Sequence, residues 1–163
     1  MNIKNMKKIS FILCIFLIVA ACKKDVKTDW KPMDLLQYSV PITILAPDSV
    51  DVNAQNLGGV IQDVTLKAPG YSIQIYGTSL ETNDLARLKS EQLNEVKGNR
   101  FFSRIVQEEE NGFIYESVID TIANYSFRYI LPRGDKLYTF QTGIVETYSL
   151  PEAKKLYQAV KQD

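Results

Sequence analysis

From residue 38 onward, apolar and polar residues alternate with a period of two, in short runs that are separated by turn residues. The runs cover residues 38–46, 60–68, 71–78, 101–109, 113–119, 124–131 and 136–145. Because successive side chains of a strand point to opposite faces, this period predicts half-buried β-strands. Pro69-Gly70, Asn111-Gly112 and Arg133-Gly134-Asp135 lie between consecutive runs and are typical of hairpin turns. The sequence therefore predicts strands that pair antiparallel with their neighbours.

A first helix is predicted over residues 82–97, where the period changes to that of an α-helix. Its apolar residues fall on one side of a helical wheel: Leu85, Ala86, Leu88, Leu93 and Val96. Thr82, Asn83 and Asp84 suit a helix start, and Gly98 suits a helix end. This segment separates the first three predicted strands from the last four.

A second helix is predicted at the C-terminus. Ser149 and Glu152 have the spacing of a capping box. Leu156 and Tyr157 lie at the centre of the apolar face, whereas Lys155 is expected on the opposite, exposed face. We expect this helix to pack on the sheet as part of the core.

The order of these elements predicts an α+β fold in one domain, residues 37–163. It consists of a twisted antiparallel sheet of about six or seven strands with two helices packed on it, either on one face or one on each side. The element order over residues 38–161, with a long C-terminal helix, is similar to that of small domains of the PsbP and Mog1 type. That resemblance implies an accessory or adaptor module and no particular site residues.

The first 21 residues have the zones of a secretory signal peptide. Lys4, Lys7 and Lys8 form a positive start, and an apolar run follows that is too short to span a bilayer comfortably. The segment Val19-Ala20-Ala21-Cys22 then resembles the lipobox of bacterial lipoproteins. The resemblance implies cleavage after Ala21 and attachment of diacylglycerol and palmitate at Cys22. An ordinary secretory signal is the alternative.

Residues 22–36 are predicted to be the lipidated cysteine and a tether, in which Trp30 packs on the domain or contacts a partner. Two or three acyl chains exceed what stable membrane anchoring needs. Lys23-Lys24-Asp25 resembles in part the surface-export signal of Bacteroides-group lipoproteins, and no Asp follows Cys22 directly. We therefore expect an outer-membrane protein, on either the periplasmic face or the cell surface.

Composition limits the chemistry that the domain can perform. All 19 acidic residues and 16 of the 19 basic ones follow residue 21, so the mature chain has a formal charge of −3 and no electrostatic signature for nucleic acid. The chain has no histidine, and its two cysteines are Cys14, in the signal, and Cys22. This excludes the usual general base and the common zinc ligand. We predict no catalytic residue, no metal site and no cofactor.

Aromatic residues are the main candidates for ligand contacts. Tyr125, Phe127 and Tyr129 alternate on one predicted strand, and Tyr138 and Phe140 alternate on the next. At a period of two, such residues form either core packing and cross-strand pairs or an aromatic cleft for a glycan, peptide or lipid.

Three further segments have both a structural and a functional interpretation. The polar loop predicted over residues 47–59 contains Asp48 and Asp51 and could bind calcium, but it lacks the EF-hand pattern. Glu108-Glu109-Glu110 is better explained as a solvated hairpin tip than as a calcium site. Arg133-Gly134-Asp135 matches an adhesive tripeptide, and it is also ordinary hairpin chemistry.

Three classes of function remain open. The first is a membrane-anchored, non-enzymatic module that binds an envelope protein, a glycan or another envelope component. The second is a carboxylate-dependent glycan hydrolase, which needs two carboxyl groups about 5 to 10 Å apart in a cleft. The third is an inhibitor or self-protection lipoprotein.

Overall fold

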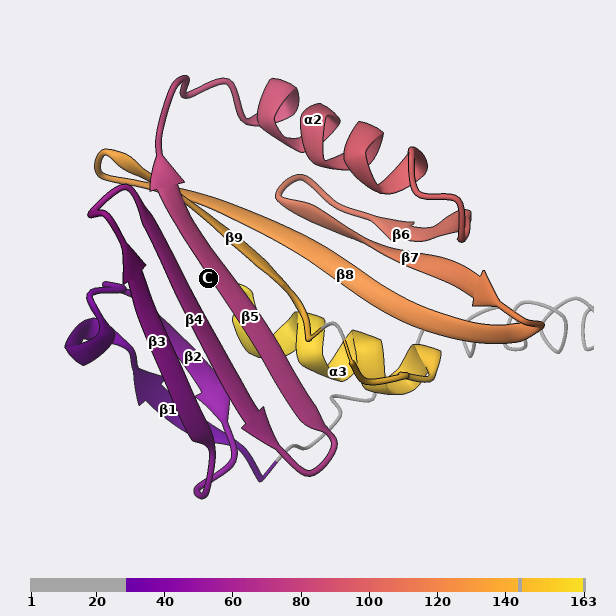
Figure 1. The fold of residues 1–163 in the computed structure, drawn as a ribbon, viewed down its shortest axis with the longest axis horizontal. Coiled ribbons are helices and arrows are strands. Elements are labelled where there is room, and N and C mark those ends of the chain that lie inside the picture. Colours follow the sequence, from indigo (N-terminus) through magenta and orange to yellow (C-terminus); the bar gives the residue numbers. More distant parts are fainter. Residues whose placement is uncertain (1–28, 144, 163) are drawn as a thin grey trace, which may run out of the picture.

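The computed structural model describes residues 29–143 and 145–162, and over these residues the chain forms nine strands, one short 3-10 helix and two α-helices (Figure 1). The elements are β1 (Lys31–Asp34), η2 (Leu36–Tyr38), β2 (Thr43–Ala46), β3 (Asp51–Leu57), β4 (Ile61–Ala68), β5 (Tyr71–Ser79), α2 (Leu85–Lys97), β6 (Phe102–Glu108), β7 (Gly112–Ile119), β8 (Ile122–Arg133), β9 (Lys136–Thr142) and α3 (Leu150–Val160). The signal peptide and Cys22 lie outside the described residues.

Seven strands form one antiparallel sheet in the order β3-β4-β5-β9-β8-β7-β6, and β1 pairs with β2 separately. The first three strands form a meander at one edge. The chain then passes through α2 to the far edge, and a second meander returns β9 to the side of β5. The prediction of an α+β fold with an antiparallel sheet of six or seven strands is confirmed.

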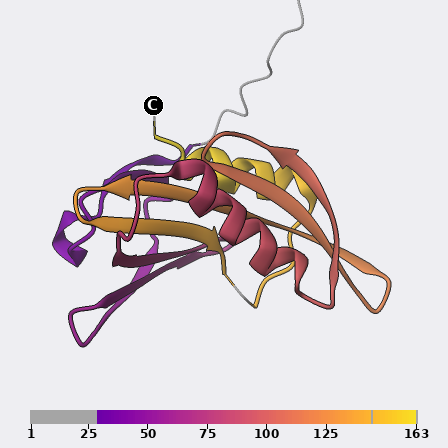
Figure 2. The same ribbon diagram turned by 90° about the horizontal axis from the view of Figure 1, so that it is seen from above.

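The two helices lie on opposite faces of the large sheet (Figures 1 and 2). α2 packs against β6 and β8, and α3 packs against β7, β8 and β9 from the other side, where it also contacts β2. Of the two arrangements expected from the sequence, the structure has one helix on each side. In the described part of the chain, no helix is long and apolar enough to cross a membrane.

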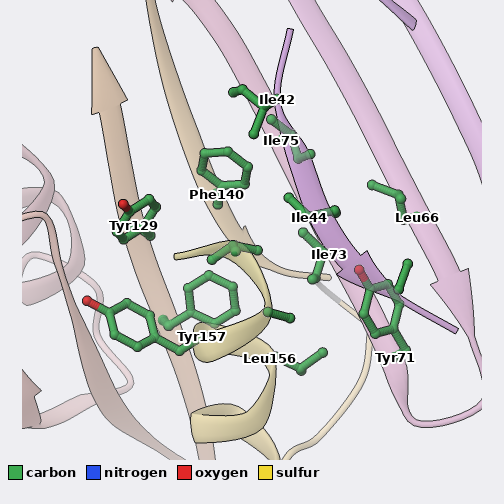
Figure 3. Packing of buried hydrophobic residues seen from close by; sticks show 14 of the residues in the cluster. Ile42, Ile44, Leu66, Tyr71, Ile73, Ile75, Tyr129, Phe140, Leu156 and Tyr157 are labelled. Atoms are coloured by element: carbon green, nitrogen blue, oxygen red, sulfur yellow. The ribbon is translucent and has the colours of Figure 1, made fainter. Parts of the chain in front are cut away.

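The main core lies between the sheet and the layer that contains α3 and β2 (Figure 3). Strands contribute alternate residues to it, such as Ile73 and Ile75 from β5, and α3 contributes Leu156 and Tyr157. Four other buried apolar residues lie outside this cluster, on α2 and on the strands beneath it: Leu88, Val96, Phe113 and Ile130. The α2 side therefore has only a small apolar core, and much of that sheet face is polar.

Local capping determines where both helices begin. The Asp84 carboxylate accepts a hydrogen bond from the backbone N–H of Arg87 at 3.0 Å, so α2 starts at Leu85, three residues after the predicted start. At α3, the Glu152 carboxylate accepts from both the backbone N–H and the hydroxyl of Ser149. This is the capping box expected from the sequence.

The folded domain begins earlier than the expected boundary at residue 37. Lys31–Asp34 pairs with Thr43–Ala46, and Trp30 packs edge-on against Tyr71 with ring centroids 4.9 Å apart. The single strand expected over residues 38–46 is replaced by the second half of this hairpin, because η2 and Ser39, which has a φ of 62°, turn the chain before β2. Much of the expected tether is thus part of the fold.

The loop expected over residues 47–59 contains a strand instead. β3 (Asp51–Leu57) pairs along its whole length with β4 and forms one edge of the sheet. Its sequence does alternate, with Val50, Val52 and Ala54 between polar residues, and Val50 and Val52 pack partly against the main core, but most of the other side chains are exposed. Its backbone nevertheless gains the hydrogen bonds of the ladder, and Gly58 and Gly59, both with positive φ, close the hairpin.

Candidate functional site

The candidate site is a polar pocket on the α2 side of the sheet, which we call the sheet-face pocket. It has a volume of about 330 Å³ and lies where α2 ends and β9 finishes. A smaller hollow of about 90 Å³ adjoins it and shares four lining residues. The pocket is lined mainly by amide, hydroxyl and aromatic side chains and one guanidinium: Asn99, Phe101, Tyr115, Ser117, Asn124, Ser126, Arg128 and Gln141.

Strand pairing explains why these residues share one face. Arg128 lies opposite Phe113 on β7 and opposite Gln141 on β9, while Gln141 lies opposite Gln74 on β5. Cross-strand partners point to the same side of a sheet. Residues that alternate with these along the strands, such as Phe127 beside Arg128 on β8, point to the other side of the sheet and enter the main core.

Arg128 is the charged group of the pocket. Its side chain is only 15% exposed, and one guanidinium nitrogen lies 3.7 Å from a carboxylate oxygen of Glu95, whose side chain is 64% exposed. That distance is longer than a hydrogen bond. The pair is therefore a loose ion pair, and Arg128 lines both hollows.

Two asparagines at the pocket use their side-chain oxygens to hold the backbone. The Asn99 oxygen accepts from the N–H of Phe101 at 2.9 Å, and the Asn124 oxygen accepts from the N–H of Tyr148 at 2.8 Å. Each side-chain amide has two N–H donors besides its oxygen. These two side chains can therefore offer a ligand N–H donors and the second lone pair of each oxygen.

A chain of amides supports the floor of the pocket. The Gln141 amide donates to the Gln74 oxygen at 3.0 Å, and the Gln74 amide donates to the Asp63 carboxylate at 3.1 and 3.2 Å. Both glutamines are 8% exposed. A buried amide is stable only when it is hydrogen-bonded, so this chain fixes the orientation of Gln141.

Gly143, at the rim of the pocket, is held tightly against β5. Its N–H donates to the Ser72 carbonyl at 3.0 Å, and a Cβ at this position would lie 1.9 Å from the Ser72 hydroxyl oxygen. Only glycine fits this approach. In the described part of the chain, that hydroxyl is also the one buried side-chain polar atom with no hydrogen-bond partner.

A second hollow, of about 390 Å³, lies on the other side of the molecule, between β2 and the end of α3. Its lining includes Ile44, Leu45 and Ala159, and Lys161 is its one charged residue. The Lys161 ammonium is already paired with Glu109 at 2.8 Å. This hollow therefore offers a ligand fewer polar groups than the sheet-face pocket does.

The aromatic candidates from the sequence occupy the core. Phe127, Tyr129, Tyr138 and Phe140 are at most 3% exposed, and Tyr129 packs against both Phe140 and Tyr157. Tyr125 is half-buried against the same cluster. Of the two interpretations, core packing therefore applies to these residues, and the pocket is lined by Phe101 and Tyr115 instead.

The other candidate segments lie apart from the pocket. Asp48 pairs with Lys31, Asp51 and Asn53 belong to β3, and the described residues contain no cluster of three acidic side chains that could hold a metal ion. Gly134 and Asp135 form a tight turn between β8 and β9. The Glu108–Glu110 tip is only partly solvated, because Glu108 pairs with Lys89 of α2 and Glu109 with Lys161.

Sequence reasoning missed Arg128, Asn124 and Gln141 as site residues. Each is polar at a position that alternates with core residues, and such positions are usually solvated in an antiparallel sheet. The residues around Gln74 and Gln141 gave no warning of burial, because residues 71–75 and 138–141 alternate apolar and polar residues as a strand with one solvated face does.

The fold and the pocket together define an α+β domain with a pocket of mixed polar and apolar lining on one face of its sheet. Comparisons with protein-family models, curated proteins and solved structures found no match to this chain.

Proposed function

We propose that this chain is a lipid-anchored protein of the bacterial outer membrane whose domain binds a protein or another envelope component without catalysing a reaction. The observation that carries the proposal is the sheet-face pocket. Its size is at the lower end of the range for small-molecule sites, and its lining provides both hydrogen-bond donors and acceptors. Together with the lipobox at Cys22, it indicates a tethered binding module.

The groups in the pocket suit binding better than glycan hydrolysis. Hydrolysis by carboxylates needs one carboxyl group as an acid and a second as a base or nucleophile. The sheet-face pocket and the hollow beside it have one carboxylate between them, Glu95. Amides and hydroxyls recognise a ligand without reacting with it.

The position of the proposed anchor leaves the sheet-face pocket accessible to a ligand. Only seven residues separate Cys22 from Trp30, so this segment spans at most about 29 Å. Trp30 packs beside α3, where the Lys155 ammonium lies 4.1 Å from the centre of its ring. From an anchor at Cys22, the chain would therefore enter the domain on the α3 side, across the sheet from the pocket.

The binding part of the proposal is tested by filling the pocket. Ser117 is half-buried and lines both hollows, so Ser117→Trp places an indole where a ligand would lie. Affinity-tagged full chains, purified from detergent-solubilised envelopes, should recover a specific envelope component. Ser117→Trp should reduce this recovery at least about tenfold, because the indole occupies the space in which the ligand makes its contacts. Mass spectrometry of the eluates measures this.

The matched control is Ser90→Trp, on the exposed side of α2. It adds the same surface indole away from the pocket and should leave recovery unchanged. Equal recovery with the wild-type chain and both variants would show that the pocket is not the binding site.

A further inference from the structure

We infer that the sheet-face pocket recognises a carboxylate-bearing sugar, with Arg128 pairing with the carboxylate. This inference rests on the proposed binding function and adds the chemical class of the ligand.

The electrostatics of the pocket favour an anion. The Arg128 side chain is 85% shielded from solvent. Its acidic neighbour is the exposed carboxylate of Glu95, 3.7 Å away. A shielded guanidinium is stabilised by short, charge-assisted hydrogen bonds, which a carboxylate supplies in bidentate form. Arg100 adds positive charge at the rim, since its guanidinium stacks 4.5 Å from the centre of the Phe101 ring.

The hydrogen-bonding groups also favour an oxygen-rich ligand. The amide N–H groups of Asn99 and Asn124 can donate to a ligand, while the oxygen of each side chain already accepts one backbone N–H and keeps a second lone pair. The hydroxyls of Ser117 and Ser126 both donate and accept. Sugar hydroxyls and ring oxygens are complementary to such a mixed set.

The shape and aromatic content of the pocket indicate a compact ring. Phe101 and Tyr115 provide flat apolar surface among the polar groups. A volume of about 330 Å³ is at the lower end of the range for small-molecule sites, which suits a ligand group the size of one ring. A sugar ring with one carboxylate combines the apolar face, the hydroxyls and the negative charge that this lining matches.

The test compares acidic and neutral sugars that are otherwise closely matched. The full chain in detergent is titrated with glucuronate against glucose, and with N-acetylmuramate against N-acetylglucosamine, by calorimetry or ligand-observed NMR. A charge-assisted pair predicts about tenfold to hundredfold tighter binding of the acid in at least one couple. The couple that shows the preference distinguishes a uronic acid from a cell-wall sugar as the source of the carboxylate.

Arg128→Gln should remove that preference while leaving weak binding of the neutral sugar. The matched control is Arg133→Gln, which removes the same charge from an exposed position at the other end of β8. If Arg128→Gln does not fold, the affinities of the wild-type chain for the acidic and the neutral sugar still test whether the ligand carries a carboxylate.

Equal affinity for the acidic and neutral sugars, or binding of neither, would overturn the ligand class. Loss of envelope binding in Ser117→Trp would then still support the proposed function, so failure of the inference and failure of the function are distinguishable. An acid preference that persists in Arg128→Gln would overturn the role of Arg128.

Discussion

Glu116 is a charged residue on the face of the sheet that carries the main core. Its side chain is 11% exposed and accepts hydrogen bonds from Arg104 at 2.9 and 3.3 Å and from the Ser103 hydroxyl at 2.9 Å. Hydrogen bonds from Arg104, Tyr125 and Ser103 lower the pKa of Glu116 to about 2. The carboxylate thus remains ionised where half-buried Tyr125 and the core begin.

This lowered pKa predicts a pH dependence of stability. The folded pKa, about 2, is below the ordinary value of 4.5, so the stabilisation is complete above about pH 4.5 and is lost as the pH falls toward 2. Glu116→Gln should therefore lower the urea midpoint at pH 7, and the difference from wild type should narrow between pH 4.5 and 2. Urea titrations at several pH values measure this.

Glu110→Gln is the matched control, because Glu110 is exposed at the β6–β7 turn. It should leave the midpoint nearly unchanged at every pH. A difference between wild type and Glu116→Gln that does not vary with pH would mean that ionisation of Glu116 is not the cause.

At the scale of elements, the β6–β7 hairpin links both helical layers. Adjacent residues of a strand point to opposite faces. Glu108 accordingly reaches Lys89 of α2 at 3.1 Å, and Glu109 reaches Lys161 beyond α3 at 2.8 Å. Burial raises the pKa of Glu109, but hydrogen bonds from Lys161 and Gln107 outweigh it and hold the pKa below its usual value.

α3 is a structural layer of the core, and Leu156 is the residue that tests this. Leu156 is fully buried in the main core. Because removing a buried leucine side chain costs about 2 to 5 kcal/mol, Leu156→Ala should lower the free energy of unfolding by that amount. Urea denaturation of the chain from residue 22, carrying Cys22→Ser, measures it.

Lys154, rather than Lys155, provides the matched control for Leu156→Ala. Lys155, expected on the exposed face, instead places its ammonium over the Trp30 ring, so Lys155→Ala would remove this contact and is not a neutral control. Lys154 is exposed on the same helix, and Lys154→Ala should change stability by less than about 0.5 kcal/mol. Equally small effects of Leu156→Ala and Lys154→Ala would show that α3 is not docked.

At the scale of the whole molecule, Trp30 and the sheet-face pocket lie on opposite faces of the large sheet. Trp30, the only tryptophan of the chain, contacts Tyr71 and Lys155 in the α3 layer. The sheet-face pocket lies across the sheet from them. A short link from Cys22 to Trp30 would therefore orient the domain as well as retain it.

The anchor itself is tested by replacing Cys22. Cys22→Ser should abolish incorporation of labelled palmitate and shift the protein out of the membrane fraction, because stable anchoring needs the acyl chains. Metabolic labelling and fractionation measure both effects. Cys14→Ser removes the other cysteine and should change neither, whereas continued labelling of Cys22→Ser would exclude the lipobox interpretation.

Much of the fold could be predicted because local chemistry specifies it. The alternation in residues 71–78 and 113–119, together with the turn residues beside them, indicates strands and hairpins from neighbouring residues alone. Ser149 and Glu152 likewise define the start of α3 through contacts three residues apart. Two strands were missed. β1 lies in the expected tether, and the many polar residues around the short alternation of β3 favoured a loop, so only pairing with β2 and β4 shows that these segments are strands.

The candidate site could not be predicted in this way, because neighbouring residues do not show which polar side chains of β7, β8 and β9 are covered. β5 lies beside β9, some sixty residues away in sequence, and only this pairing places Gln74 under Gln141 as support for the pocket floor. Local sequence determined the strand alternation, the helix caps and a candidate lipid attachment residue. Tertiary structure decided which polar residues are shielded, since burial depends on the layers that cover both faces of the sheet.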